Sequence, residues 1–175
     1  PVLEIFSPCR VNGMAAKLGF APGLSLDLST NDPDDNQPWD FNNVKKRRKA
    51  LDMVLQKKAL LLIGSPMCRM FSRLQNINNK QDPDLQAKMM SEARTHLKFC
   101  MDLYKIQMDN GMYFLHEHPW SASSWDEDYV KSVSNREDVY VVRGDMCQFG
   151  MFQDTPDGDV LVMKPTGFMI NASGI

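Results

Sequence analysis

Apolar and polar positions along the chain form blocks that predict strands and helices in alternation. Short aliphatic runs bounded by Ser, Pro, Asn or Gly indicate strands, and longer stretches with apolar residues three or four positions apart indicate helices. The predicted strands are residues 2–6, 23–28, 60–63, 112–115 and 139–142. The predicted helices are residues 11–18, 42–58, 84–110 and 125–133, the last capped by Ser123 or Ser124.

Strands that alternate with helices through short connections are typical of a parallel α/β sheet. We therefore predict one α/β domain over residues 1–175, with a mostly parallel sheet flanked by helices. A polar connector is predicted at residues 75–83. After the Asp157-Gly158 turn, residues 160–163 and 164–166 predict an antiparallel pair or an antiparallel edge strand.

The strand at residues 60–63 runs into the turn residues Gly64-Ser65-Pro66, and Cys68 follows directly. Open α/β sheets hold their ligands and reactive groups at the carboxyl ends of strands. Cys68 has two interpretations. It is either a small core residue or a nucleophile activated by Arg69 and by the N-terminus of a following helix. The sequence leaves both open.

Several other predicted strands also end in polar side chains, among them Asp27, Glu117 and Asp145. These strand ends converge on one edge of a doubly wound sheet, where cofactors and substrates bind. Asp27 is placed either to accept hydrogen bonds from ribose hydroxyls or to cap a turn. His116 and His118 would share one face of a strand, but no third ligand is indicated, so we predict no metal site.

The charge balance excludes a wholly basic nucleic-acid binder, because 20 Lys and Arg face 22 Asp and Glu for a net charge of -2. It leaves room for a local basic patch. The run Lys45, Lys46, Arg47, Arg48 and Lys49 opens the predicted helix at residues 42–58. This run is either a solvated helix face or a contact for phosphates.

The four cysteines are widely spaced and form no CxxC pair, which argues against a zinc site or a disulfide framework. Reduced thiols predict an intracellular protein, nuclear or cytoplasmic. No apolar run approaches the ~20 residues that span a bilayer, so no membrane association is expected. The chain begins in a strand-like run without Met, and we expect it to be a piece of a longer protein.

The order of these features resembles the cytosine-5 DNA methyltransferases, a branch of the Rossmann-like S-adenosylmethionine methyltransferases. The segment Gly64-Ser65-Pro66-Met67-Cys68-Arg69-Met70-Phe71-Ser72 is similar to the family's Gly-Gly-Pro-Pro-Cys-Gln-x-Phe-Ser loop. Phe114-Leu115-His116-Glu117-His118-Pro119 is similar to its Phe-x-x-Glu-Asn-Val segment. Glu4-Ile5-Phe6-Ser7 lies where the family has its Asp-Leu-Phe-x-Gly-x-Gly cofactor turn. Other segments, His-Glu-His-Pro-Trp and Lys-Pro-Thr-Gly-Phe, are similar to domains of retroelement polyproteins.

The resemblance implies a Rossmann-like methyltransferase fold and S-adenosylmethionine as cofactor. It gives Cys68 the role of nucleophile and Glu117 that of holding the cytosine ring. It implies cofactor contacts at Phe6, Ser7, Asp27 and Pro66. The implied partner is nucleic acid, DNA rather than RNA, and we assign its contacts to Lys45, Lys46, Arg47, Arg48 and Arg69.

The chain departs from the family pattern at four places. Pro8-Cys9-Arg10 replaces the glycine turn, Met67 precedes the cysteine, His118 follows the glutamate, and no Arg-x-Arg follows Gly150. Two functions therefore stay open: a cytosine-5 methyltransferase, or a catalytically degenerate module that binds nucleic acid or protein within a polyprotein. A small cysteine hydrolase is a weaker third hypothesis, because no suitable His-Asp pair is present.

Overall fold

The computed structural model describes residues 1–56, 59–72 and 82–172, and a six-stranded sheet forms its centre. The strand order is β2-β1-β3-β4-β8-β5. The parallel neighbours are β2 (Ser25–Leu26), β1 (Val2–Ile5), β3 (Leu61–Gly64) and β4 (Tyr113–Pro119). Between β4 and the edge strand β5 (Tyr140–Asp145), β8 (Pro165–Ile170) runs antiparallel to both. The predicted α/β class, with a mostly parallel sheet and antiparallel pairing at one edge, is confirmed.

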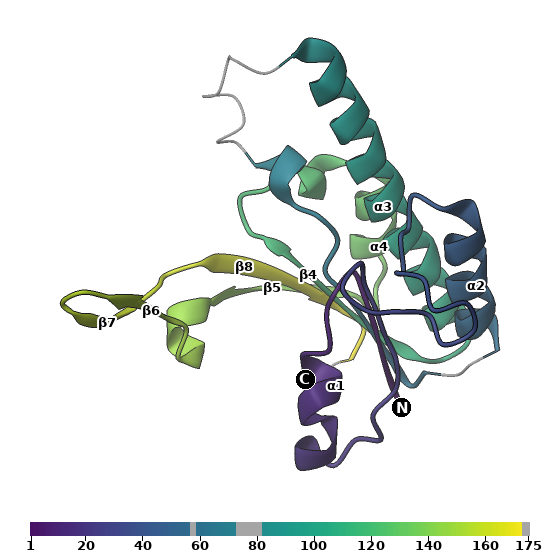
Figure 1. Cartoon of the computed structure of the whole chain (residues 1–175), viewed down its shortest axis with the longest axis horizontal. Coiled ribbons are helices and arrows are strands. Elements are labelled where there is room, and N and C mark those ends of the chain that lie inside the picture. The colour runs from purple at the N-terminus through teal and green to yellow at the C-terminus, as the bar shows by residue number, and fades with distance from the viewer. Residues whose placement is uncertain (57–58, 73–81, 173–175) are drawn as a thin grey trace.

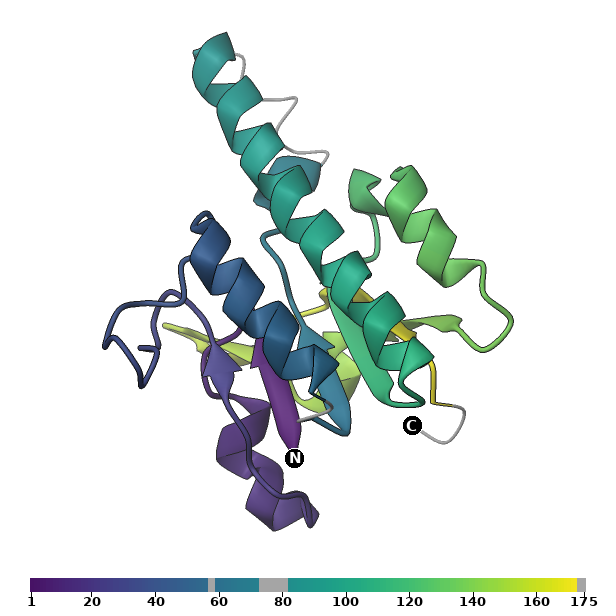
Figure 2. The same ribbon diagram turned by 90° about the vertical axis from the view of Figure 1, so that its right-hand side faces the viewer.

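Helices cover the sheet on both faces (Figures 1 and 2). On one face lie α2 (Val44–Leu55), α3 (Pro83–Asp109) and α4 (Asp128–Ser134). On the other lies α1 (Val11–Ala15), which continues as a 3-10 turn over Ala16–Leu18. The long helix α3 begins at Pro83 behind the N-cap Asp82, whose side chain accepts a hydrogen bond from the Asp84 amide. Pro suits the first turn of a helix, because its missing N–H is not needed there.

Three local predictions were wrong. First, β4 runs on to Pro119, because His116 and His118 alternate inward with the strand's buried positions. Second, the segment from Ser123 forms only a 3-10 turn, Ser123–Asp126, and α4 begins after it without a side-chain cap. Trp125 is tied back to β4 instead, since its indole Nε1 donates to the Pro119 carbonyl over 2.8 Å.

Third, the strand β7 (Gly158–Leu161) does not pair with the segment that follows it. It forms a separate two-stranded hairpin with β6 (Phe152–Thr155), and residues 165–170 enter the main sheet as β8. Gly158, with φ of 110°, supplies the backbone conformation that closes the hairpin. The predicted connector at 75–83 and the end of the predicted helix at 57–58 lie outside the described residues, apart from Asp82 and Pro83.

The core lies between α3 and the sheet, and one contact in it controls the end of β3. The ring of Tyr104, on α3, stacks on Phe114 with centroids 4.5 Å apart, and its hydroxyl lies 3.1 Å from His116 Nδ1. A Cβ atom on Gly64 would stand 2.0 Å from the Tyr104 hydroxyl oxygen. Only glycine therefore fits at the last position of β3, directly before the Ser65-Pro66 turn.

A buried ion network fixes the polar segment between β2 and α2. Lys46 Nζ lies 2.7 Å from Asp32 Oδ2 and 2.7 Å from Asp35 Oδ1, and Lys49 also pairs with Asp32. Both ammonium groups lie over the ring of Trp39, at 5.1 and 5.3 Å from its centroid. Burial opposes ionisation of Asp32, but the hydrogen bonds from Lys46 and Lys49 lower its pKa to about 2.

This network predicts a loss of stability in acid. The Asp32 pKa is depressed from 3.8 to about 2 on folding, so its contribution is present above pH 4 and is lost as the pH falls from 4 towards 2. Asp32→Asn is expected to lower the free energy of unfolding by about 2 kcal/mol at neutral pH, because it removes the carboxylate that pairs with Lys46 and Lys49. The loss is limited to about this amount because Lys46 keeps Asp35 as a partner. Urea unfolding at pH 7 and pH 3 measures both effects.

Asp34→Asn is the matched control, since Asp34 pairs with Lys49 from an exposed position in the same segment. Exposed pairs contribute less than about 1 kcal/mol. An equal loss of stability in the two variants would contradict the assignment of the stabilising role to Asp32.

Candidate functional site

Two pockets adjoin at the carboxyl ends of β1 to β4. The aromatic pocket, with a volume of about 240 Å³, has walls that include Asp27, Trp39, Phe41 and His96. The cysteine pocket, of about 300 Å³, has walls that include Ser7, Pro66, Cys68, Arg69, Glu117 and Lys164. Phe6, Ser65 and Met67 line both pockets. The structure thus brings all the predicted catalytic and cofactor residues to one edge of the sheet.

Phe6 lines both pockets and has an unusual backbone conformation. Its φ is +55°, in the left-handed region that bulky residues rarely adopt. Its ring lies 4.6 Å from that of Phe41 and 5.1 Å from that of His96, measured between centroids. Such strain persists where surrounding contacts enforce it, and it concentrates at functional sites. The strain here directs an aromatic ring into the wall shared by both pockets.

Glu4 orders the turn after β1, where the glycine turn would be. Its carboxylate is fully buried and accepts hydrogen bonds from the amides of Arg10, Val11 and Asn12 over 3.3, 3.0 and 2.8 Å. The Ser25 hydroxyl donates to it over 2.8 Å. Burial alone would raise the pKa of Glu4, but these hydrogen bonds lower it below its ordinary value. Sequence reasoning missed this role; the signal was one acidic residue inside an apolar strand.

Ser7 takes part in the same turn. Its buried hydroxyl lies 3.2 Å from Glu4 Oε1 and 3.0 Å from the Pro8 carbonyl.

Asp27 caps a turn and also lines a pocket, so the turn-cap interpretation does not exclude a contact with a ligand. Its Oδ1 caps a turn by accepting hydrogen bonds from the amide and hydroxyl of Ser29 over 2.9 and 2.7 Å, while the residue lines the aromatic pocket.

Cys68 lies half-buried in the wall of the cysteine pocket. The expected helix after it is instead a single 3-10 turn, Arg69–Phe71, with Cys68 as its N-cap residue. A helix dipole needs several aligned peptides, so this turn is not the helix N-terminus that was expected beside Cys68. The cations Arg10, Arg69 and Lys164 line the same pocket as Cys68.

Lys164 is a functional candidate that the sequence did not reveal. It lies just before β8, and its Nζ is 3.4 Å from Glu117 Oε1. The ion pair crosses from β8 to β4, two strands whose pairing the sequence did not predict. The pocket thus combines one thiol, one carboxylate and three cations.

The predicted basic contacts for nucleic acid are only partly available. Lys46 is buried in the ion network with Asp32 and Asp35, so it is removed from the residues proposed to contact phosphates. Arg47 donates to the Phe41 carbonyl, and Arg48 pairs with Asp52 on the surface. Lys45 is exposed. Neither pocket is lined by this run, whereas Arg69 lines the cysteine pocket.

His116 and His118 do share one face of β4, as predicted, but His116 packs on Tyr104, His118 packs on Phe71 and Trp125, and neither histidine lines either of the two pockets. Their rings stack with centroids 5.4 Å apart. Burial lowers the pKa of His116 well below its ordinary value and that of His118 to about 4. Among the residues that the structure describes, no group of three His, Cys, Asp or Glu side chains could hold a metal ion.

No protein-family model matches the chain, and no curated protein matches it significantly. Within residues 1–56, 59–72 and 82–172, no helix is both long and apolar enough to cross a bilayer.

Proposed function

We propose that this chain is a cytosine-5 methyltransferase-like domain with a Rossmann-like methyltransferase fold, which transfers a methyl group from S-adenosylmethionine to cytosine in DNA. The observation that carries the proposal is the wall of Phe6, Ser65 and Met67 common to the two pockets. A methyl donor and its acceptor must lie within bonding reach of each other. Adjoining pockets, one aromatic and one containing a thiol and a carboxylate, meet that need.

The aromatic pocket fits a nucleoside. Phe6, Phe41 and His96 offer ring faces for a flat base, and Asp27 offers an acceptor for ribose hydroxyls. Buried His96 Nε2 has no hydrogen-bond partner within the described part of the chain. Buried polar atoms normally have a hydrogen-bond partner, so a polar ligand in the aromatic pocket would supply the partner that His96 Nε2 lacks. When bound, S-adenosylmethionine would supply a methyl group activated by a sulfonium.

Cys68 and Glu117 would have separate roles in the reaction at cytosine, Cys68 as the nucleophile and Glu117 as the residue that binds the ring. The Cys68 thiolate would add to C6 of the ring, which makes C5 nucleophilic. Once C5 carries the new methyl group, loss of the C5 proton to solvent would break the bond between sulfur and C6 and restore both the aromatic ring and the thiolate. Glu117 holds the ring at N3 and offsets the charge that develops there. Lys164 positions Glu117 through their ion pair. A base within a duplex first has to leave the stack to reach a pocket of this size.

One observation favours a second candidate, the degenerate module that binds nucleic acid or protein. The amides of Arg10, Val11 and Asn12 already donate hydrogen bonds to the Glu4 carboxylate, so they are not free to contact a cofactor. In a glycine-rich turn such amides approach the cofactor. A domain that has lost its cofactor would keep the fold and the cations of the cysteine pocket, and would bind its partner without methyl transfer.

Calorimetric titration with S-adenosylmethionine distinguishes the two candidates. The enzyme is expected to bind the cofactor saturably, and Asp27→Ala to weaken binding about tenfold through the lost ribose contact. Asp145→Ala is the matched control, because this strand-end carboxylate pairs with Arg143 and lines neither of the two pockets described above. Absence of heat at millimolar cofactor would contradict the enzyme and leave the module.

A further inference from the structure

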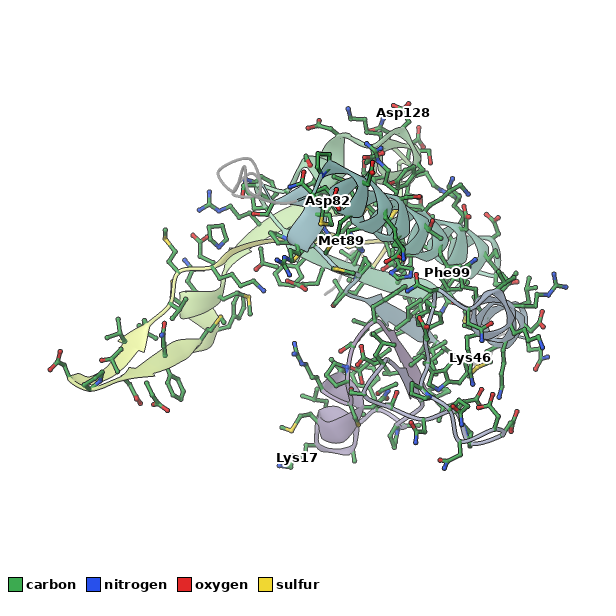
Figure 3. All side chains as sticks on the ribbon, turned by 45° about the horizontal axis from the view of Figure 1, so that its top comes forward. Lys17, Lys46, Asp82, Met89, Phe99 and Asp128 are labelled. Atoms are coloured by element: carbon green, nitrogen blue, oxygen red, sulfur yellow. The ribbon has the colours of Figure 1, made fainter. Side chains whose placement is uncertain are left out.

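The hairpin of β6 and β7 projects from the body of the domain as an arm, defined here as residues 149–163 (Figures 1 and 3). Six of its apolar side chains are 39 to 70% exposed: Phe149, Met151, Phe152, Val160, Leu161 and Met163. A two-stranded hairpin is marginally stable in water. Phe152 and Leu161 are paired across the ladder and share one face of the hairpin with Asp154 and Asp159, and exposed apolar side chains gathered in this way mark an interaction site. Another surface is therefore expected to cover the arm.

The charge of the arm restricts what that surface is. Residues 149–163 contain three Asp and no Lys or Arg. Asp154 and Asp159 are directly opposite each other in the ladder between β6 and β7, where like charges destabilise pairing. Neither carboxylate forms an ion pair within the residues described. The partner of the arm is thus apolar with a basic rim, and the phosphates of nucleic acid would be repelled.

The chain carries such a surface itself, on and after α1. Residues 10–26 contain Arg10 and Lys17 and no acidic residue. Four apolar side chains there are 42 to 61% exposed: Met14, Leu18, Phe20 and Leu24. We call residues 10–24 the α1 surface. In Figures 1 and 3 the arm points away from α1 and from the labelled Lys17, so an arm does not reach the α1 surface of its own chain.

We propose that the arm of one copy docks on the α1 surface of a second copy, with Asp154 and Asp159 facing the partner's Lys17. A twofold axis repeats the contact, so each copy gives one arm and receives one. The proposal does not depend on the proposed function. It does place the interface beside the cysteine pocket, because Lys164 at the base of the arm and Arg10 at the start of the α1 surface both line that pocket.

Sedimentation equilibrium over roughly 1 to 100 µM tests the proposal. The unmodified chain is expected to show a monomer–dimer equilibrium. Lys17→Glu and the double variant Asp154→Lys/Asp159→Lys are each expected to weaken dimerisation at least tenfold, since each brings like charges together. Lys88→Glu, an exposed change on α3, is the matched control and should leave the equilibrium unchanged. Circular dichroism confirms that every variant is folded.

An equimolar mixture of the two interface variants gives the most specific result. In a mixed dimer the lysine arm meets Glu at position 17, and the unmodified arm meets Lys17, so both contacts are complementary and dimers should return. A monomeric unmodified chain at 100 µM would overturn the proposal. So would dimerisation that survives both charge reversals, or a mixture that stays monomeric.

Discussion

Replacing Cys68 with alanine is expected to reduce methyl transfer to cytosine by at least about 10⁴-fold and to leave S-adenosylmethionine binding unchanged. Without the thiol no covalent bond to C6 forms, and C5 stays a poor nucleophile inside an aromatic ring. The cofactor is unaffected, because Cys68 lies in the cysteine pocket and not in the aromatic pocket. Incorporation of labelled methyl groups into cytosine-containing DNA, with calorimetry for the cofactor, measures both.

Cys147→Ala is the matched control, since Cys147 is also half-buried but lines neither of these two pockets. It should keep full activity. Glu117→Gln should lose about 10²-fold or more in activity, because an amide cannot replace the carboxylate that Lys164 holds. Methyl transfer that persists in Cys68→Ala would refute the covalent mechanism.

Replacing Gly64 with alanine is expected to destabilise the protein by about 3 kcal/mol, the largest stability effect we predict. The new Cβ would stand 2.0 Å from the Tyr104 hydroxyl oxygen and 3.1 Å from the ring carbon that carries it. The ring cannot yield easily, because it is fully buried and stacked on Phe114. Chemical unfolding gives the free energy directly.

Gly13→Ala serves as the comparison. Its Cβ would meet only Cys9 Sγ, at 3.8 Å, and alanine is favoured over glycine in a helix such as α1. This change should be neutral or stabilising. Adding Tyr104→Phe to Gly64→Ala removes the clashing hydroxyl and should recover part of the loss. Additive effects of the two substitutions would show that the steric account is wrong.

The close packing of Gly64 against Tyr104 also affects the two pockets, because the residues that follow Gly64 line them. Gly64 is followed by Ser65, which lines both pockets, and Pro66, which lines the cysteine pocket. A displaced β3 end would therefore move the Cys68 loop. We expect Gly64→Ala to lose cofactor affinity even where it remains folded.

Much of the fold could be predicted because strand and helix patterns are local. The β1 and β3 strands, α3 and the α/β class follow from apolar runs and helical spacing that neighbouring residues determine. The strand ends at Phe6, Asp27, Cys68 and Glu117 could be grouped because the topology of a parallel sheet brings them to one edge. The placement of β8 could not be predicted, since nothing local to residues 165–170 specifies pairing with β4 and β5.

The sequence by itself determined the alternating elements, the loop that carries Cys68, and the polar strand ends around it. Only the tertiary structure decided which charged side chains are paired within the protein and which line the pockets. Lys46 belongs to a basic run by sequence, yet Asp32 and Asp35 remove it from the surface. Lys164 is an isolated lysine by sequence, yet β8 brings it to Glu117. The reason is physical: a side chain's charge is local, but its partners and its burial depend on residues distant in the chain.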